Sequence, residues 1–187
     1  MDDLTEQRRQ KDDFFKHSPH SPLGPVQQTK FAGLSYYDPD PAFAFELVAE
    51  PFVDQKHIKM QTSTGDVRSY QRWGQVKFQV AGQDAPLTLY YAPGQPAFFV
   101  PFMDATTGSE TYDAGRYVEV ERLPEGKVRL DFNLAYNPYC AYSPPRSLLV
   151  DSGQEYVPWS CPIPPQENHL TVPIRAGEKK PAGDWVE

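Results

Sequence analysis

The chain of 187 residues has little of several features that would indicate a function class. It has two cysteines, too few for the disulfide scaffold of a small secreted domain. Its longest apolar runs, such as AFFVPF over 97–102, are far shorter than the roughly 20 residues of a membrane-spanning helix. The N-terminal stretch is polar and contains no apolar signal region. We therefore expect a cytoplasmic protein without a membrane partner.

Positive charge is also scarce. The chain has 18 Lys and Arg against 25 Asp and Glu, a formal net charge of −7 at pH 7. This balance argues against a nucleic-acid partner, because such a partner requires a basic surface. Gly-rich phosphate loops, the Gly-x-Ser-x-Gly elbow and the His-Glu-x-x-His zinc motif are absent. The sequence leaves the cofactor and the oligomeric state open.

Aromatic residues and proline are abundant instead, with 11 Tyr, 11 Phe and 20 Pro. The proline content is about twice the average, so we expect many fixed turns and loops. Aromatic residues at this frequency indicate a packed core rather than disorder. The length fits a single domain over 1–187 that can bury a substantial core.

Hydrophobic periodicity predicts one helix followed by a β core. The helix covers 3–16, where Asp3 and Glu6 fit a capping box. Over 42–176 the apolar residues recur with a period of two, which is typical of strands. The predicted strands lie at 42–50, 57–62, 70–80, 87–91, 97–102, 116–123, 127–134 and 170–176.

Turn signals separate several of these strands. STGD over 63–66 predicts a hairpin, PEG over 124–126 predicts another turn, and Gly74 inside the longest run predicts a bulge. We expect a mainly β fold: a single antiparallel β-barrel or sandwich-like domain of about eight or nine strands with one N-terminal helix. Residues 179–187 are expected to form a mobile tail.

Three segments resemble a known family. They are FMDATTGSETYDAGRY over 102–117, LDFNLAYNPYCAYS over 130–143 and CPIPPQENHLTVPIRAGEK over 161–179. Together they resemble an uncharacterised bacterial and archaeal family, the domain of unknown function DUF1684. The resemblance covers nearly the whole chain and implies a single-domain protein, but it brings no activity. Against the family pattern, 144–156 looks like an insertion between the two cysteines.

Arg116 is the strongest individual indication of a site. It begins a predicted strand and shares a face with the valines of that strand, so its side chain is expected to point inward. A buried guanidinium must be paired or must face a cavity. One interpretation is an internal pair with Asp104, Asp131 or Glu167. The other is a bidentate contact with the carboxylate or phosphate of a ligand.

Polar residues near Arg116 predict a pocket if their faces turn inward. Asp131 and Asn133 share one face of the 127–134 strand, and Asn137 and Asn168 either brace loop backbone or contact a ligand. The first functional hypothesis is a protein that binds a small anionic or carboxylate-bearing ligand in a polar, aromatic-lined pocket. Its predicted ligand-binding residues are Arg116, Asp131, Asn133, Tyr136, Asn137 and Asn168.

Cys140 and Cys161 leave four alternatives open. A disulfide would close a loop of about twenty residues, but a reducing cytosol argues against it. Spacing to Glu167 and His169 fits no standard zinc site, so no metal site is predicted. A nucleophilic Cys140 would need a base, for which His169 is the one histidine in the motif region. The remaining alternative is that both thiols simply fill gaps between rings.

Two further function classes stay open with these cysteines. One is a hydrolase or transferase that uses Cys140, or the pair Asp131 and Glu167, as its reactive group. The other is a structural scaffold whose motif residues only hold its own loops. The sequence does not decide whether the protein is an enzyme.

Overall fold

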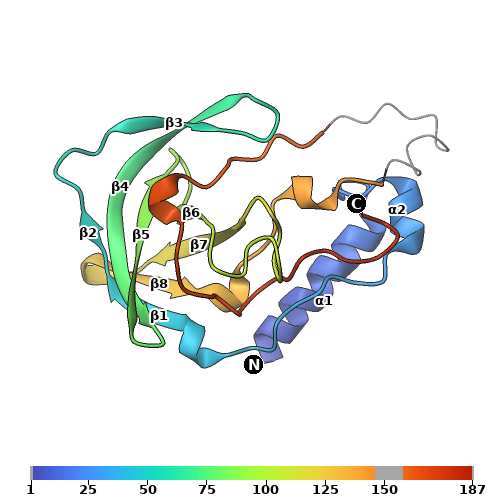
Figure 1. The fold of residues 1–187 in the computed structure, drawn as a ribbon, viewed down its shortest axis with the longest axis horizontal. Coiled ribbons are helices and arrows are strands. Elements are labelled where there is room, and N and C mark those ends of the chain that lie inside the picture. Colours follow the sequence, from blue (N-terminus) through green and yellow to red (C-terminus); the bar gives the residue numbers. More distant parts are fainter. Residues whose placement is uncertain (1, 146–157, 187) are drawn as a thin grey trace.

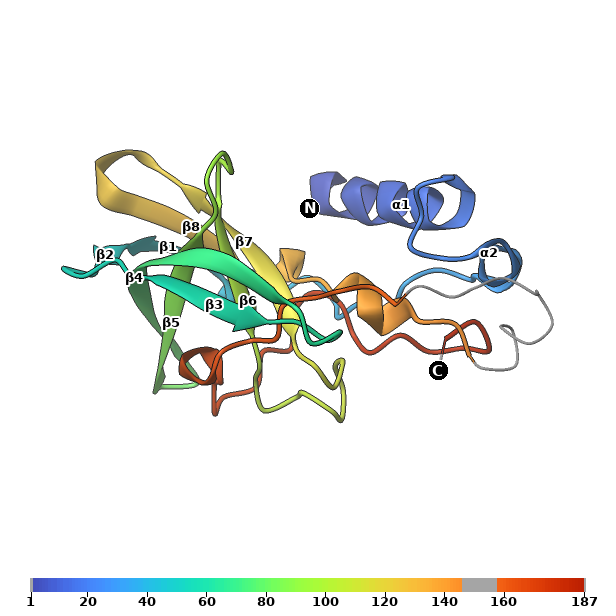
Figure 2. The same ribbon diagram turned by 90° about the horizontal axis from the view of Figure 1, so that it is seen from above.

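A computed structural model describes residues 2–145 and 158–186 of the chain (Figure 1). The expected mainly β fold with an N-terminal helix is confirmed. Helix α1 spans Asp2–His17 and is followed by the short α2 over Pro25–Lys30, and both lie beside the sheet (Figures 1 and 2). Neither helix has the length and apolar character needed to cross a membrane. The insertion expected over 144–156 lies outside the described residues from 146 onward.

Eight strands of the described residues form one antiparallel sheet that nearly closes into a barrel. The order is β1-β8-β7-β6-β5-β4-β2, with β3 also paired to β4. The strands are β1 (Ala44–Val48), β2 (Glu50–Pro51), β3 (His57–Gln61), β4 (Val67–Val80), β5 (Gln83–Tyr91), β6 (Phe98–Phe102), β7 (Arg116–Arg122) and β8 (Lys127–Asp131).

Two glycines explain the course of the long strand β4. Gly65 has a φ of +86° in the turn between β3 and β4, a conformation that favours glycine. At Gly74 the β4–β5 register shifts, and a Cβ there would lie 2.5 Å from the Glu50 carbonyl oxygen of β2. The expected bulge at Gly74 is confirmed, and its cause is the close approach of the β2 backbone.

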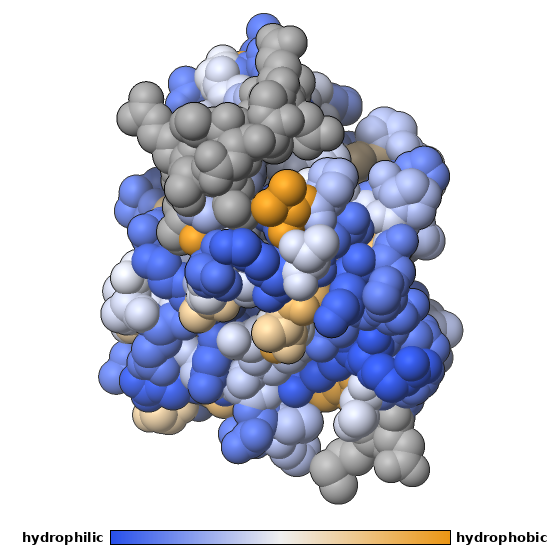
Figure 3. All heavy atoms as spheres, turned by 90° about the vertical axis from the view of Figure 1, so that its right-hand side faces the viewer, coloured by the Kyte–Doolittle hydropathy of each residue, from blue (hydrophilic) through white to orange (hydrophobic). Residues whose placement is uncertain are grey.

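Alternating apolar residues of the strands fill the barrel interior. Val76, Leu87, Val100, Val118 and Leu130 are all fully buried there. Because each comes from a different strand, the period of two in the sequence converges on one core. The surface at the helix end is mainly hydrophilic, with isolated hydrophobic side chains (Figure 3).

A second, smaller apolar cluster joins the helices to the end of the chain. Trp185 is 2% exposed and its ring lies 4.9 Å from that of Phe31. Phe15 of α1 and Tyr142 belong to the same cluster. Within the predicted tail over 179–187, Trp185 is therefore packed against the helices, and the mobility of this segment stays a prediction.

The predicted strand over 170–176 is also wrong. Leu170, Val172, Ile174 and Ala176 are buried in alternation, as the pattern indicates, yet no strand forms there. The carbonyl oxygens of Ile174 and Ala176 accept hydrogen bonds from the Arg116 side chain. At Ile174 and Ala176 a side chain thus satisfies carbonyl oxygens that would otherwise need a strand partner.

Candidate functional site

One face of α1 brings cations to the boundary between helix and barrel. Leu4, Arg8, Lys11 and Phe15 follow one another at intervals of four, three and four residues, so they share this face. Phe15 is buried, and Arg8 and Lys11 are half-buried. The apolar stripe that docks the helix therefore carries two positive charges.

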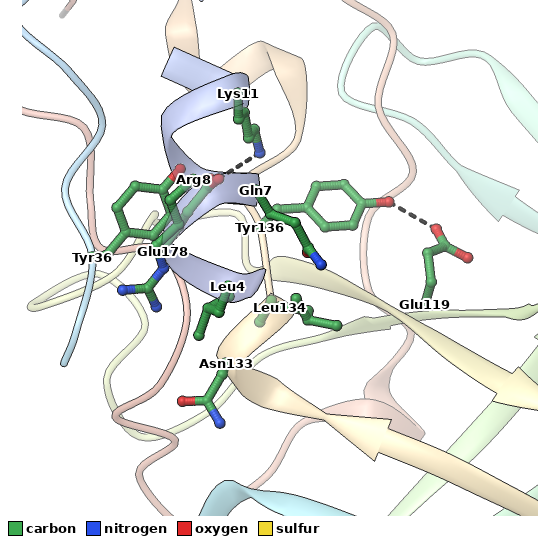
Figure 4. A pocket seen from close by; sticks show the side chains of 11 residues that line it. Leu4, Gln7, Arg8, Lys11, Tyr36, Glu119, Asn133, Leu134, Tyr136 and Glu178 are labelled. Carbon is green, nitrogen blue, oxygen red and sulfur yellow. Dashed lines mark hydrogen bonds and ion pairs between the residues drawn. The ribbon is translucent and has the colours of Figure 1, made fainter. Parts of the chain in front are cut away.

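Opposite this face lies the carboxylate of Glu178, which is 1% exposed. Its Oε1 forms an ion pair with the Lys11 ammonium (Figure 4). Its Oε2 accepts hydrogen bonds from the Asn137 backbone N–H at 2.8 Å and from the Tyr142 hydroxyl at 2.7 Å. A buried charge needs such partners, and here they tie α1 to two loops of the barrel.

Lys11 and Tyr136 each line two pockets at this boundary, which we call the helix–barrel seam. The smaller one, the α1 pocket, has a volume of about 330 Å³ and is drawn in Figure 4. The larger one, the aromatic pocket, has a volume of about 610 Å³. Asn133 lines the first and Asn137 the second, so the seam contains three of the six predicted ligand-binding residues.

The α1 pocket contains polar atoms without partners. Arg8 donates from Nη1 to the Tyr37 carbonyl oxygen, but its Nε and Nη2 are buried and unbonded. The guanidinium lies 4.4 Å from the ring centre of Tyr36, whose buried hydroxyl also has no partner. Burial raises the pKa of Glu119, which accepts a hydrogen bond from the Tyr136 hydroxyl at 2.8 Å.

The aromatic pocket combines rings with positive charge. Its aromatic walls are Tyr70, Phe99, Tyr117, Tyr136, Tyr139 and Trp159. Its described lining residues include the cations Lys11 and Arg68 but no carboxylate. Arg68 donates from Nη2 to the Ser160 carbonyl oxygen at 2.6 Å and pairs with no carboxylate of the described residues. Asn137 in the same wall is 2% exposed, and its Oδ1 is buried without a partner.

Arg116 lies inside the barrel end and is 1% exposed. Its Nη2 donates to Asp104 Oδ2 at 2.9 Å and to the Ile174 carbonyl oxygen at 2.7 Å. Its Nη1 donates to the carbonyl oxygens of Ala176 and Glu178 at 2.6 and 3.0 Å. Of the three carboxylates considered as internal partners, Asp104 is the one that pairs with Arg116. Both Nη atoms of the arginine donate to groups of the protein itself.

Asn133 and Asn168 brace loop backbone, and Asp131 supports Asn133. Asn168 is fully buried, and bonds the N–H and carbonyl of Thr88. Asn133 bonds both backbone groups of Asp40, and its own N–H donates to Asp131 Oδ1 at 2.9 Å. Asn133 thus combines a loop contact with a place in the α1 pocket.

Asp131 and Glu167 have separate partners. Arg72 forms an ion pair with Glu167 at 2.7 Å, and the Tyr90 hydroxyl donates to the same carboxylate. Burial alone would raise the pKa of Glu167, but these two hydrogen bonds hold it below its usual value. The structure therefore does not bring the two carboxylates together as an acid–base pair. The His169 ring nitrogen contacts the Pro164 carbonyl oxygen at 3.1 Å.

Cys140 and Cys161 do meet, as free thiols. The Cys140 backbone N–H donates to Cys161 Sγ at 3.3 Å, and the Tyr112 hydroxyl donates to Cys140 Sγ at 3.7 Å. The hydrogen bond from the Cys161 thiol lowers the pKa of Cys140 to about 7, although burial opposes this. No group of three metal-ligating side chains occurs over 2–145 and 158–186.

Sequence reasoning missed four residues of the seam: Arg8, Lys11, Arg68 and Glu178. A signal for two of them was present, because Arg8 and Lys11 stand at helical spacing between Leu4 and Phe15. A cation in the docking stripe of a helix requires a buried partner or a ligand. No local pattern marked Arg68 or Glu178.

The family model described as a protein of unknown function, DUF1684, matches residues 29–179. The chain belongs to this family. A solution NMR structure of an uncharacterised protein from Haloarcula marismortui is similar at 36% sequence identity, over 95% of this chain and 92% of that one, with a TM-score of 0.68. No curated protein matches the chain. The family resemblance expected from the three motif segments is confirmed. The description of the family names no activity.

Proposed function

We propose that this protein binds a small carboxylate-bearing ligand with a flat apolar body in the aromatic pocket. The observation that carries the proposal is Arg68, a cation without a carboxylate partner among the described residues, at the edge of a pocket walled by six aromatic side chains. The proposed ligand is anionic, as the sequence analysis predicts, but the residue proposed to bind its carboxylate is Arg68 rather than Arg116.

The charge of the pocket favours an anion. Lys11 and Arg68 are the charged side chains among its described lining residues, in a chain whose net charge is −7. Lys11 directs one contact to Glu178, and an ammonium has three donors, so it can also bind a ligand. A local positive charge on an acidic protein draws an anion to one place, because the rest of the surface repels it.

The walls favour a flat body. The rings of Tyr70 and Phe99 are stacked 5.3 Å apart, and Tyr117 meets Phe99 edge-on at 4.8 Å. Tyr139 and Trp159 form a second edge-on pair at 5.1 Å. Rings held by one another lose little freedom on binding, and the volume of about 610 Å³ lies in the range of small-molecule pockets.

Calorimetric titration with benzoate, and with benzamide as its neutral analogue, tests the proposal. We expect benzoate to bind more tightly than benzamide, because the amide lacks the charge that Arg68 recognises. Arg68→Gln is expected to weaken benzoate binding about 10- to 100-fold, from the loss of roughly 1.5–3 kcal/mol in hydrogen bonds to a charged group. Benzamide binding is expected to stay unchanged in this variant.

Arg129→Gln is the matched control. It removes the same charge from an exposed residue that pairs with Glu121 at 2.6 Å on the outer face of the sheet. Equal weakening by the two variants would show only a general charge effect and would contradict a site at Arg68. Failure of both probes to bind the wild type would favour the scaffold hypothesis over a binding protein.

A further inference from the structure

The two cysteines lie where two pockets approach each other. Cys161 lines the aromatic pocket, whereas Cys140 lines a third pocket of about 580 Å³. We call this third one the Cys140 pocket; Tyr112, Asp113 and Lys180 also line it. A small molecule in the Cys140 pocket therefore has access to one thiol, and the sulfur of the second lies 3.3 Å from the Cys140 backbone nitrogen.

Rigid loops hold both thiols in place. Cys140 lies in the 3-10 helix Tyr139–Tyr142, which begins after Pro138. Cys161 bonds Ser63 twice: its N–H donates to Ser63 Oγ at 3.1 Å, and its carbonyl oxygen accepts from the Ser63 N–H at 2.8 Å. The sulfurs are thus kept together by backbone contacts on both sides rather than by chance packing of side chains.

The two thiols differ in acidity. Hydrogen bonds from Cys161 and Tyr112 stabilise the Cys140 thiolate, so its pKa falls to about 7. The hydrogen bond to Cys140, together with burial, raises the pKa of Cys161. One accessible thiolate beside one protonated, buried thiol is the arrangement of an attacking and a resolving cysteine.

We propose that Cys140 and Cys161 form a two-cysteine redox site that reduces a low-molecular-weight disulfide in the Cys140 pocket. The proposal is independent of ligand binding in the aromatic pocket. Thiol–disulfide exchange needs a thiolate, a space for the substrate and a second thiol within reach, and the described residues supply all three. Packing alone would not require the bond that the Tyr112 hydroxyl donates to Cys140 Sγ at 3.7 Å.

The reaction has two steps. The Cys140 thiolate attacks one sulfur of R–S–S–R, the substrate S–S bond breaks, and one thiolate RS⁻ leaves and takes up a proton. Cys161 then loses its proton to solvent and attacks the Cys140 sulfur of the mixed disulfide, releasing the second RS⁻. The substrate gains two electrons, the protein loses two, and a Cys140–Cys161 disulfide remains.

Intact-mass spectrometry of the full chain with glutathione disulfide tests the site. We expect the wild type to lose two hydrogen atoms without retaining glutathione, and peptide mapping to find the Cys140–Cys161 bond. Cys161→Ser is expected to accumulate glutathione on Cys140, because the resolving thiol is gone. Cys140→Ser is expected to stay unmodified.

The pH profile of the wild-type rate is a second readout that does not depend on a cysteine variant. We expect the rate to rise with a midpoint at about pH 7, where Cys140 ionises. Tyr112→Phe removes the donor at 3.7 Å from Cys140 Sγ and is expected to move this midpoint upward. Retention of the native circular dichroism spectrum shows that each variant is folded.

Three results would overturn the proposal. The first is glutathione addition to Cys161 in Cys140→Ser at the same rate as addition to Cys140 in Cys161→Ser. The second is reaction of the wild type only after unfolding in urea, which is the behaviour of thiols that fill gaps in a core. The third is a stable glutathione adduct on wild-type Cys140 with no internal disulfide, which would show that Cys161 does not resolve it.

Discussion

Two ion pairs of the described residues contain a buried carboxylate, and they differ in how fully their atoms are bonded. Arg116 and Asp104 are 1% and 0% exposed as side chains, and Asp104 also accepts bonds from Thr106 and from the Ile174 N–H. Lys11 and Glu178 are 29% and 2% exposed. The first pair is saturated with protein contacts, whereas the second opens onto two pockets.

Some buried side chains near the Lys11–Glu178 pair also lack hydrogen-bond partners. Buried side-chain atoms without a hydrogen-bond partner occur, among the described residues, in Arg8, Tyr36 and Asn137. All three line the pockets of the helix–barrel seam. Buried polar groups are normally bonded, so unbonded ones gathered at the helix–barrel seam support the ligand site proposed there. On the function proposed above, the first pair is structural and the second borders the ligand site.

The largest expected effect comes from breaking the saturated pair. Arg116→Met leaves Asp104 charged and buried and leaves three carbonyl oxygens without their donor. We expect the free energy of unfolding to fall by about 3–5 kcal/mol in urea titrations. Arg129→Met, at an exposed pair, is expected to cost less than about 1 kcal/mol. A similar small loss for both would contradict the structural role of Arg116.

Breaking the Lys11–Glu178 pair is expected to have a smaller effect, which lowers stability and raises ligand affinity. Glu178→Gln weakens the bonds to the Asn137 N–H and the Tyr142 hydroxyl and frees the Lys11 charge. We expect unfolding free energy to fall by about 1–3 kcal/mol while benzoate affinity rises. Glu121→Gln at the exposed pair is expected to change neither. A fall in both quantities for Glu178→Gln would show that Lys11 does not contact the ligand.

The smallest effect is expected at the unpartnered hydroxyl of Tyr36. Tyr36→Phe removes no bond to the protein, so we expect unfolding free energy to change by less than about 0.5 kcal/mol. Tyr142→Phe makes the same chemical change but deletes the 2.7 Å bond to buried Glu178, at an expected cost of about 1.5–3 kcal/mol. Equal losses of unfolding free energy for the two variants in urea titrations would contradict the distinction between bonded and unbonded hydroxyls.

The sequence predicts the barrel hairpins well because their signals are local. Gly74 reports a close backbone approach, and alternating apolar residues report one buried face of a strand. The same alternation misleads over 170–176, where the buried face is real but both backbone groups of Ile174 bond the side chains of Arg116 and Asp104. Periodicity measures burial, and it does not show which groups satisfy the backbone.

The candidate site is less accessible to sequence reasoning because its contacts join distant segments. Lys11 and Glu178 are 167 positions apart, and Arg68 meets the backbone of Ser160 across 92. The inward direction of Arg116 follows from strand alternation, but the choice of Asp104 as its partner depends on how the loops fold back. Asn133 and Tyr136 line a pocket, and their predicted role in ligand binding stays a prediction; the cations Arg8 and Lys11 in the same pocket are not predicted from the sequence.

The most direct test of the central claim is the location of a bound anion. A ¹H–¹⁵N NMR titration of the labelled chain with benzoate reports on every backbone amide. We expect saturable shifts concentrated at Arg68, Tyr70, Phe99 and Tyr139, and weak or absent shifts at Asp104 and Arg116. Shifts centred on Arg116, or spread evenly over the exposed lysines and arginines, would contradict a binding site at the helix–barrel seam.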